Sequence, residues 1–146
     1  METAFDLLHA KSPSRIVAVP PEATVWEATT LMNKQGVGSV LVISGSRLAG
    51  IFTERDVLRR IIGLARSPVD TLVGEVMTAD VICCGQEMPI DEVAELMRSH
   101  RVRHLPVLDA GGDVIGLVSI GDVNAHRFAS CEIALHQVED YIYRRA

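Results

Sequence analysis

The sequence predicts an α/β (α+β) fold in which one small unit is used twice. Three observations lead to this prediction: an internal repeat, short apolar segments that alternate with amphipathic helical segments, and glycine-containing turns between paired strands. The chain has 146 residues, of which 48% are hydrophobic and only 4% aromatic, so aliphatic side chains must build the core. A chain of this length can bury one good core as a compact unit.

The internal repeat becomes visible when the chain is shifted against itself by 65 residues, which lays Val25 over Ile90. One extra residue in the turn of the second copy raises the offset to 66 from Gly50 and Gly116 onward. The other coinciding pairs are Glu27/Glu92, Leu31/Leu96, Met32/Met97, Val37/Val102, Val42/Val107, Thr53/Ser119, Asp56/Asp122 and Val57/Val123. A solenoid stacks three or more shorter units, so we expect these two copies to pack face to face instead.

Each copy is expected to begin with a short strand, at 16–19 and at 81–84, followed by a polar turn and a helix. The helices carry apolar residues at intervals of three and four, and this stripe should face the sheet. The stripe comprises Val25, Ala28 and Met32 in the first copy and Ile90, Val93, Ala94 and Met97 in the second. A hairpin is expected next in each copy, pairing 40–43 with 48–52 and 105–108 with 114–118.

A second helix is expected after each hairpin. In the first copy it carries apolar side chains at Val57, Leu58, Ile61 and Ile62, exposes Arg59 and Arg60, and ends at Ser67-Pro68. Outside the copies, we expect both terminal segments to cover the ends of the module, and a leftover apolar face on the C-terminal helix is a candidate surface for a second subunit. These segments carry Phe5, Leu7 and Leu8 at the start and Ile133, Ala134, Val138, Tyr141 and Ile142 at the end. The predicted division is a cap at 1–15, repeat 1 at 16–66, a linker at 67–78, repeat 2 at 79–128 and a C-terminal helix at 129–146.

The junction between hairpin and second helix has the same pattern in both copies: a hydroxyl residue followed three positions later by aspartate. One interpretation is a capping box, in which Thr53 or Ser119 caps the helix and Asp56 or Asp122 returns the hydrogen bond. The other is a ligand site. Free N–H groups and a hydroxyl at a helix start attract a phosphate or ribose oxygen, and a carboxylate can accept both hydrogens of a ribose diol. The pattern by itself leaves both interpretations open.

Three motifs together resemble a CBS domain pair, a family named after cystathionine β-synthase and also called a Bateman module. They are the duplicated junction, the Val76-Met77-Thr78 triplet before the second copy, and the segment Val102-Arg103-His104-Leu105-Pro106-Val107. The resemblance covers nearly the whole chain, roughly Phe5 to Ile142. The junction sequences Thr-Glu-Arg-Asp and Ser-Ile-Gly-Asp are similar to those of small stand-alone proteins of this type. The resemblance implies a tandem pair of CBS repeats, each a small sheet with two flanking helices, packed with pseudo-twofold symmetry.

The resemblance also implies two clefts between the repeats that can hold an adenosyl ligand: AMP first, or NAD, ADP, ATP or S-adenosylmethionine. Carried over by position, the first cleft comprises Ile51, Thr53, Arg55, Asp56, Thr78, Ile82, Val102 and Arg103. The second comprises Val17, Val37, Gly38, His104, Leu117, Ser119 and Asp122, with Arg103 or His104 brought towards the phosphate. The implied roles are aspartate on the ribose hydroxyls, the hydroxyl residue on ribose or phosphate, apolar side chains around adenine, and basic residues on phosphate. We expect the first cleft to be used, because Gly121 stands in the second copy where the first has Arg55.

Composition argues against other classes of partner. The net charge of -5, with acids and bases interspersed, offers no basic face for nucleic acid. No apolar run approaches the roughly 20 residues that cross a bilayer, and the start METAFDLLHAK has acids where a secretory leader has bases, so we expect a cytoplasmic protein without a membrane partner. The cysteines, Cys83, Cys84 and Cys131, form neither a CxxC motif nor a zinc spacing, and no metal site is expected.

The sequence therefore predicts a regulatory module rather than an enzyme, with no catalytic residues. Nucleotide occupancy would change the packing of the repeats or of two modules in a homodimer, and an unidentified protein partner would read that change. One alternative is an interaction-only structural dimer with non-functional clefts. The other is a thiol redox protein that uses Cys83 and Cys84, although no activating environment for a thiolate is evident.

Overall fold

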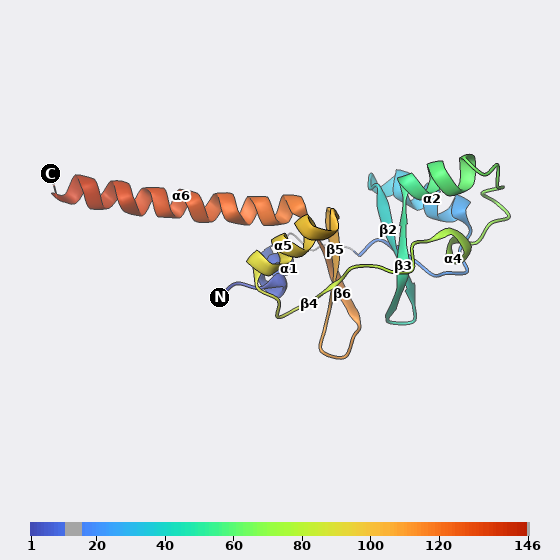
Figure 1. Ribbon diagram of the computed structural model, residues 1–146, viewed down its shortest axis with the longest axis horizontal. Coiled ribbons are helices and arrows are strands. Elements are labelled where there is room, and N and C mark those ends of the chain that lie inside the picture. Colours follow the sequence, from blue (N-terminus) through green and yellow to red (C-terminus); the bar gives the residue numbers. More distant parts are fainter. Residues whose placement is uncertain (11–15, 146) are drawn as a thin grey trace.

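The computed structural model describes residues 1–10 and 16–145 and contains two three-stranded sheets (Figure 1). In each sheet the middle strand pairs in parallel with the first strand and antiparallel with the third. The strand orders are β1-β2-β3 and β4-β5-β6, so each copy of the repeat forms its own sheet. This arrangement confirms the predicted fold of two small sheets with flanking helices.

The two repeats are built from matching elements. Repeat 1 contains β1 (Ala18–Val19), α2 (Val25–Gln35), β2 (Ser39–Ser44), β3 (Arg47–Thr53), α3 (Glu54–Asp56) and the π-helix η1 (Val57–Ile62). Repeat 2 contains β4 (Cys84–Gly85), α5 (Ile90–His100), β5 (His104–Leu108), β6 (Val114–Ser119) and α6 (Ile120–Arg145). Both predicted helical stripes are buried, and both predicted hairpins form.

Each sheet is covered on both faces. Val40 and Val42 of β2 belong to the core that packs under α2, whereas Leu41 between them points the other way and is still buried. Pro106 occupies the same place in β5 and is also buried. The second face of each sheet is therefore turned toward the middle of the molecule, where the repeats meet.

Two short helices each pack into the core of the repeat that they do not directly precede in sequence. α1 (Ala4–Ala10) precedes repeat 1, yet its buried residues Leu7 and Leu8 belong to the core of repeat 2. α4 (Val73–Val76) lies in the linker before repeat 2, yet Val73 and Val76 belong to the core of repeat 1. Each core is thus completed by a segment that stands in sequence before the other repeat, and the expected linker is partly core.

The first strand of each repeat is shorter than expected. Only Ala18 and Val19 pair with β2, and only Cys84 and Gly85 pair with β5. Pro20 follows Val19 and has no N–H to continue the ladder. In the second copy, Val81 and Ile82 lie before the strand and line a cavity instead.

The helix after Thr53 differs from its prediction in pitch and length. η1 closes with an i→i+5 hydrogen bond from Gly63 N to Leu58 O at 2.8 Å. This wider turn keeps Ile61 in the core but leaves Leu58 and Ile62 exposed, so the expected apolar face was half wrong. The helix also ends at Ile62, before Ser67-Pro68, and the chain then passes through Ala65 with φ of 52°.

α6 is one continuous helix of 26 residues that runs across the expected boundary between repeat 2 and a separate C-terminal helix. Its first turns hold it to the body: Val123 is fully buried, and Arg127 Nη2 lies 3.1 Å from Asp91 Oδ1. The remainder projects away from both sheets (Figure 1). The expectation that this segment covers an end of the module was therefore wrong, because its side chains from 128 to 143 are exposed.

Candidate functional site

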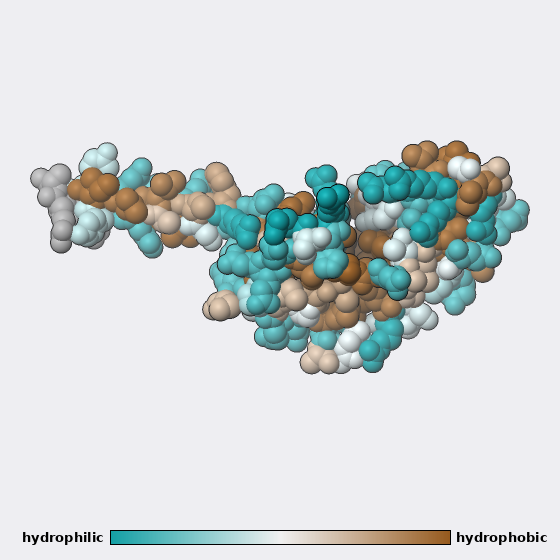
Figure 2. Space-filling model, in the orientation of Figure 1, coloured by the Kyte–Doolittle hydropathy of each residue, from teal (hydrophilic) through white to brown (hydrophobic). Residues whose placement is uncertain are grey.

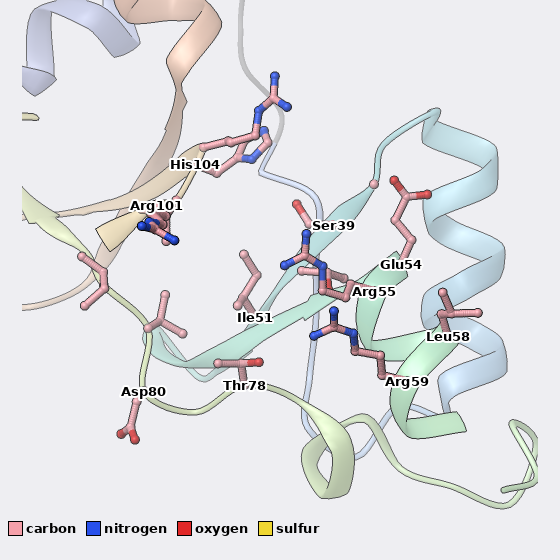
Figure 3. Close-up of a pocket in the computed structure, with 16 residues that line it drawn as sticks. Ser39, Ile51, Glu54, Arg55, Leu58, Arg59, Thr78, Asp80, Arg101 and His104 are labelled. Carbon is pink, nitrogen blue, oxygen red and sulfur yellow. The ribbon is translucent and has the colours of Figure 1, made fainter. Parts of the chain in front are cut away.

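A cavity of about 760 Å³ lies between the two repeats (Figure 3). Repeat 1 contributes the start of β2, the end of β3 and the start of the following helix. The linker contributes its last residue, and repeat 2 contributes the segment before β4 and the segment that leads into the start of β5. The lining residues are Gly38, Ser39, Ile51, Thr53, Glu54, Arg55, Leu58, Arg59, Thr78, Asp80, Val81, Ile82, Arg101, Val102, Arg103 and His104. The volume lies within the range of small-molecule sites, roughly 300–1,000 Å³.

The linker is held against repeat 1 at the floor of this cavity. Ile51 N donates to Thr78 O and Thr78 N donates to Ile51 O, both at 2.9 Å. Gly50 permits the close approach, since a Cβ at that position would lie 2.6 Å from Thr78 O. The backbone pairing thereby places Thr78 beside Ile51 in the lining of the cavity (Figure 3).

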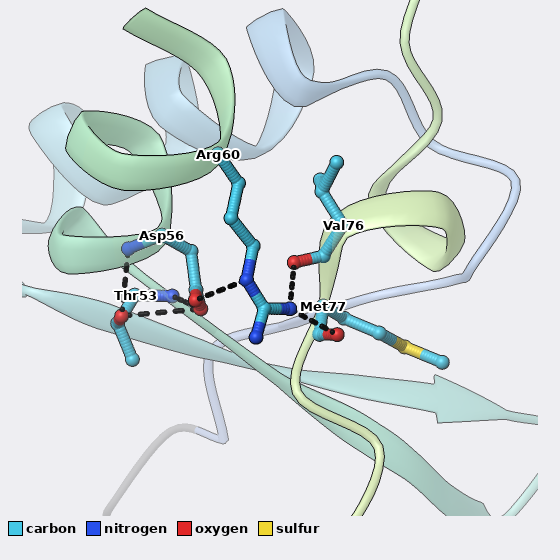
Figure 4. Close-up of polar contacts among 5 residues, drawn as sticks. All are labelled: Thr53, Asp56, Arg60, Val76 and Met77. Atoms are coloured by element: carbon cyan, nitrogen blue, oxygen red, sulfur yellow. Dashed lines mark hydrogen bonds and ion pairs between the residues drawn. The ribbon is translucent and has the colours of Figure 1, made fainter. Parts of the chain in front are cut away.

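A capping box starts the helix at the cavity wall (Figure 4). Asp56 Oδ2 accepts hydrogen bonds from Thr53 N at 3.0 Å and from Thr53 Oγ1 at 3.1 Å, while Asp56 N donates to Thr53 Oγ1 at 3.2 Å. Repeat 2 repeats the motif: Ser119 N donates to Asp122 Oδ2 at 2.7 Å. The capping interpretation of both junctions is confirmed.

Arg60 joins this cap to the linker. Its Nη1 donates to the carbonyl oxygens of Val76 and Met77, both at 2.9 Å, and its Nε lies 3.7 Å from Asp56 Oδ1 (Figure 4). Asp56 is buried, with 7% of its surface exposed, and already interacts with two residues. It therefore supports the cavity wall from behind and is absent from the lining.

The cavity wall carries an excess of positive charge. Arg55, Arg59, Arg101 and Arg103 line it with His104, against two acids, Glu54 and Asp80. Within the described residues, none of these four guanidinium groups has an ion-pair or hydrogen-bond partner. Figure 3 shows Arg55 and Arg59 projecting from the repeat 1 helix toward the wall that holds Arg101, while Asp80 points away from the centre. An anionic group would be attracted into this space.

Arg101 occupies a backbone conformation that usually belongs to glycine. It is the C-cap of α5 with φ of 54°, and its counterpart at the end of α2 is Gly36 with φ of 65°. A non-glycine residue in this region costs about 1–2 kcal/mol. The fold is therefore less stable with arginine than with glycine at this lining position. Strained backbone conformations of this kind cluster at ligand-binding sites.

The structure brings together most of the first predicted cleft. Ile51, Thr53, Arg55, Thr78, Ile82, Val102 and Arg103 all line the cavity, and Asp56 lies behind Thr53. Gly38 and His104, assigned to the second cleft, line this cavity as well. The reason is geometric: Gly38 immediately precedes β2 and His104 begins β5, and both strand starts border the same space.

The other residues assigned to the second cleft do not line this cavity. Val17 lines a separate cavity of about 160 Å³ with Ile16, Ala18, Leu31 and Gln35. Val37 is exposed, Leu117 pairs with Pro106 in the hairpin, and Ser119 and Asp122 cap α6. Neither of these two cavities is lined by Val37, Leu117, Ser119 or Asp122.

Sequence reasoning missed several lining residues, namely Ser39, Glu54, Leu58, Arg59, Asp80, Val81 and Arg101. Two signals could have found some of them. Leu58 and Arg59 follow Arg55 by three and four positions and so share its side of the helix. Arg101 replaces the C-cap glycine of the first copy, which marks a position where a side chain is kept despite its backbone cost.

Of the two adjacent cysteines, Cys84 does not have the environment of a reactive thiol. Burial, and secondarily the charge of Cys83, raise the pKa of Cys84 from about 9 to about 11. A raised pKa keeps the thiol protonated and weakly nucleophilic at neutral pH. Among the described residues, His, Cys, Asp and Glu side chains form no group of three that could hold a metal ion. The described helices also include none with the length and apolar character to cross a membrane.

The family model of the CBS domain matches the chain twice, at residues 12–63 and 73–127. The chain belongs to the CBS-domain family. YhcV of Bacillus subtilis (strain 168), a CBS domain-containing protein, is 29% identical over 117 residues, which span 80% of this chain and 82% of that protein. The CBS pair is a regulatory module, so the match places this chain among regulatory proteins.

Solved structures share the architecture. A protein with CBS domains from Burkholderia ambifaria MC40-6 has a TM-score of 0.79 at 42% identity, covering 88% of this chain and 95% of that chain. The CBS domain protein PAE2072 from Pyrobaculum aerophilum, solved in complex with AMP, has a TM-score of 0.71 at 28% identity and covers 83% of this chain and 89% of its own. A relative of this CBS pair therefore binds an adenine nucleotide.

Proposed function

We propose that this CBS pair is a regulatory module that binds an adenine nucleotide, with AMP the first candidate, in the 760 Å³ cavity between its repeats. The observation that carries the proposal is the combination, in one cavity built by both repeats, of apolar side chains with four arginines that have no partner among the described residues. AMP bound to the Pyrobaculum relative supports the choice of ligand. NAD, ADP and ATP share the same adenosine and phosphate groups and are the other candidates.

The ligand fits the chemistry of the walls. Ile51, Ile82 and Val102 offer an apolar surface for the adenine ring, and Thr53 and Thr78 offer hydroxyls for ribose or phosphate oxygens. The arginines on both repeats would share the phosphate, so binding would draw the two walls together. Asp56 would contact the ribose only if a hydroxyl entered its existing network with Thr53 and Arg60.

The wider proposal concerns what the ligand changes. A cavity shared by two repeats couples occupancy to their packing, provided that the ligand binds one packing more tightly than another. We propose that a homodimer of this module presents that change to a protein partner in the cytoplasm, and that the module itself catalyses no reaction.

The first experiment is a thermal-shift and calorimetry panel of the full chain with AMP, ADP, ATP, NAD, S-adenosylmethionine and GTP. A ligand at about 100 times its Kd adds about 2.7 kcal/mol to stability, which moves the melting temperature by several degrees. We expect adenosine compounds with phosphate groups to raise it and GTP not to. Arg59→Ala should reduce the shift without lowering the melting temperature of the free protein, because Arg59 lines the cavity and has no partner among the described residues.

A panel without any shift would contradict the proposal and favour the interaction-only alternative. The large exposed apolar residues of α6 are the observation that supports that alternative. Adenosine is the phosphate-free control for this panel, and a shift with adenosine equal to that with AMP would remove the arginines from the phosphate role.

A further inference from the structure

The projecting part of α6 carries an apolar seam on one side of the helix. Its members are Phe128, Cys131, Leu135, Val138 and Ile142, all exposed, and they follow one another at intervals of three, four, three and four residues. Figure 2 shows hydrophobic residues in brown along the projecting helix. We propose that this seam joins α6 to α6 of a second copy of this chain as a parallel helix pair, which gives the homodimer in the proposed function its interface.

The spacing indicates a helix as the occupant. Apolar residues at alternating intervals of three and four keep one edge of a helix facing a partner helix, with each side chain packed between residues of the other strand. Phe128, Leu135 and Ile142 would then occupy a positions, and Cys131 and Val138 would occupy d positions. The seam is the same in every copy, so two copies match each other in length and register.

Charge next to the seam selects the parallel orientation. Glu132 and Glu139 both occupy e positions, and Arg127 occupies a g position. In an antiparallel pair, e positions face e positions, so Glu132 would oppose Glu139 of the partner subunit twice by symmetry. In a parallel pair, g positions face e positions of the other helix, so no glutamates oppose each other. Arg127, which pairs with Asp91 of its own chain at 3.1 Å, would face Glu132 of the partner subunit at the edge of that pair.

The body of the molecule leaves the seam accessible. The side of α6 that rests on the body is marked by the buried Val123, by His126, whose imidazole contacts the carboxylate of Glu2, and by Arg127, which pairs with Asp91. At about 100° of rotation per residue, Val123 lies roughly 100° around the helix from the middle of the seam. A second helix can therefore lie along the seam while both bodies stay at the same end.

The composition of the projecting segment also indicates that packing against another helix stabilises it. The segment from 128 to 143 contains Phe128, Ile133, Val138 and two tyrosines, residue types that do not favour an isolated helix. Most helical stability in proteins comes from packing of an amphipathic face, and no described part of this chain packs against the seam. A second copy would supply that packing.

The mass of the full chain tests the interface. Sedimentation or light scattering across a concentration series should give twice the chain mass for the wild type, and half of the wild-type mass for Leu135→Asp. Ile133→Asp is the matched control, because Ile133 is as exposed as Leu135 (60% against 63%) but lies about 200° away around the helix. A wild-type monomer at every concentration, or equal dissociation by both variants, would overturn the proposal.

The orientation is tested at Cys131, which meets its own copy across a parallel pair. Mild oxidation with diamide, which accepts the two hydrogens of two thiols as the disulfide forms, should link wild-type chains through Cys131. Leu135→Asp and Cys131→Ser should stay unlinked. A dimer that does not link at Cys131 would overturn the parallel arrangement, since an antiparallel pair places Ile142 of the partner subunit opposite that residue.

Failure of this inference is separable from failure of nucleotide binding. Leu135 lies outside the cavity, so Leu135→Asp should retain the AMP-induced thermal shift of the wild type. A variant that loses its dimer but keeps the shift assigns the two properties to two different surfaces.

Discussion

At Asp56, one carboxylate completes the helix cap with Thr53 and faces Arg60, so the residue supports the fold whether or not a ligand is present. Asp56→Ala should lower the free energy of unfolding by about 1 kcal/mol through loss of the cap. AMP affinity should also fall, by about 1.5–3 kcal/mol, if the carboxylate also holds a ribose hydroxyl. Urea unfolding and calorimetry measure the two effects separately.

Asp122→Ala is the matched control for that variant, because Asp122 forms the same cap on α6, whereas the cap residue that Asp56 holds, Thr53, lines the cavity. It should lose similar stability and less AMP affinity. An equal loss of affinity in both variants would contradict the assignment of the ligand to this cavity.

Arg101 offers a test in which stability and binding move in opposite directions. Arg101→Gly should raise the free energy of unfolding by up to about 1 kcal/mol, because glycine adopts a φ of 54° without the usual cost. The same change should weaken AMP binding several-fold through loss of a positive charge in the cavity. Arg101→Lys, which keeps charge and strain, should change both quantities less. Weaker folding of Arg101→Gly would show that the side chain serves the fold instead.

Cys84 should lower the free energy of unfolding at high pH, because the pKa of its thiol is raised in the folded state. Burial raises the pKa of its thiol to about 11, against about 9 when unfolded, so the folded state retains a proton that the unfolded state releases. The protonated thiol therefore contributes about 2–3 kcal/mol to the free energy of unfolding. That contribution is fully present below pH 9 and is lost as the pH rises through 11. Urea unfolding between pH 8 and pH 11 should show a steeper decline for the wild type than for Cys84→Ala. Parallel curves would place the thiol in a more hydrated site.

At the scale of elements, the π-helix η1 directs two neighbouring arginine side chains to different surroundings. Arg60 donates to the Val76 and Met77 carbonyls and so ties η1 to the linker, whereas Arg59 lines the cavity. Arg60→Ala should lower the free energy of unfolding by about 1 kcal/mol, because those two carbonyls lose their donor. Arg59→Ala should leave unfolding unchanged and weaken AMP binding. Denaturant melts and calorimetry on the pair check this, and the reverse pattern would contradict the assignment.

For the whole molecule, the exchange of α1 and α4 between the cores makes the repeats depend on each other. Leu8 fits against Gly116 of β6 so closely that a Cβ there would lie 2.6 Å from its methyl group, and Val73 is fully buried in repeat 1. A chain without residues 1–10 should therefore melt at a lower temperature, and a fragment of residues 16–66, which lacks α4, should not fold. Circular dichroism of these chains checks both statements. An independently folded 16–66 fragment would contradict the shared core.

The sequence by itself determined the duplication, the helical stripes, the hairpins, the capping boxes and the family. All of these are local or repeated patterns, because a stripe depends on helical periodicity and a cap on residues three positions apart. Most residues of the first cleft could be assigned as well, since Thr53 and Thr78 belong to motifs that keep their place in the fold.

Only the tertiary structure decided which segment completes which core, that Gly38 and His104 share one cavity, and that Leu58 and Ile62 leave the core. It also decided that α6 projects instead of covering an end. These outcomes depend on contacts between residues far apart in the chain, such as Leu8 with Gly116 and Arg60 with Met77. Periodicity describes which side of an element is apolar, but the partner that covers that side is set by how the elements pack together.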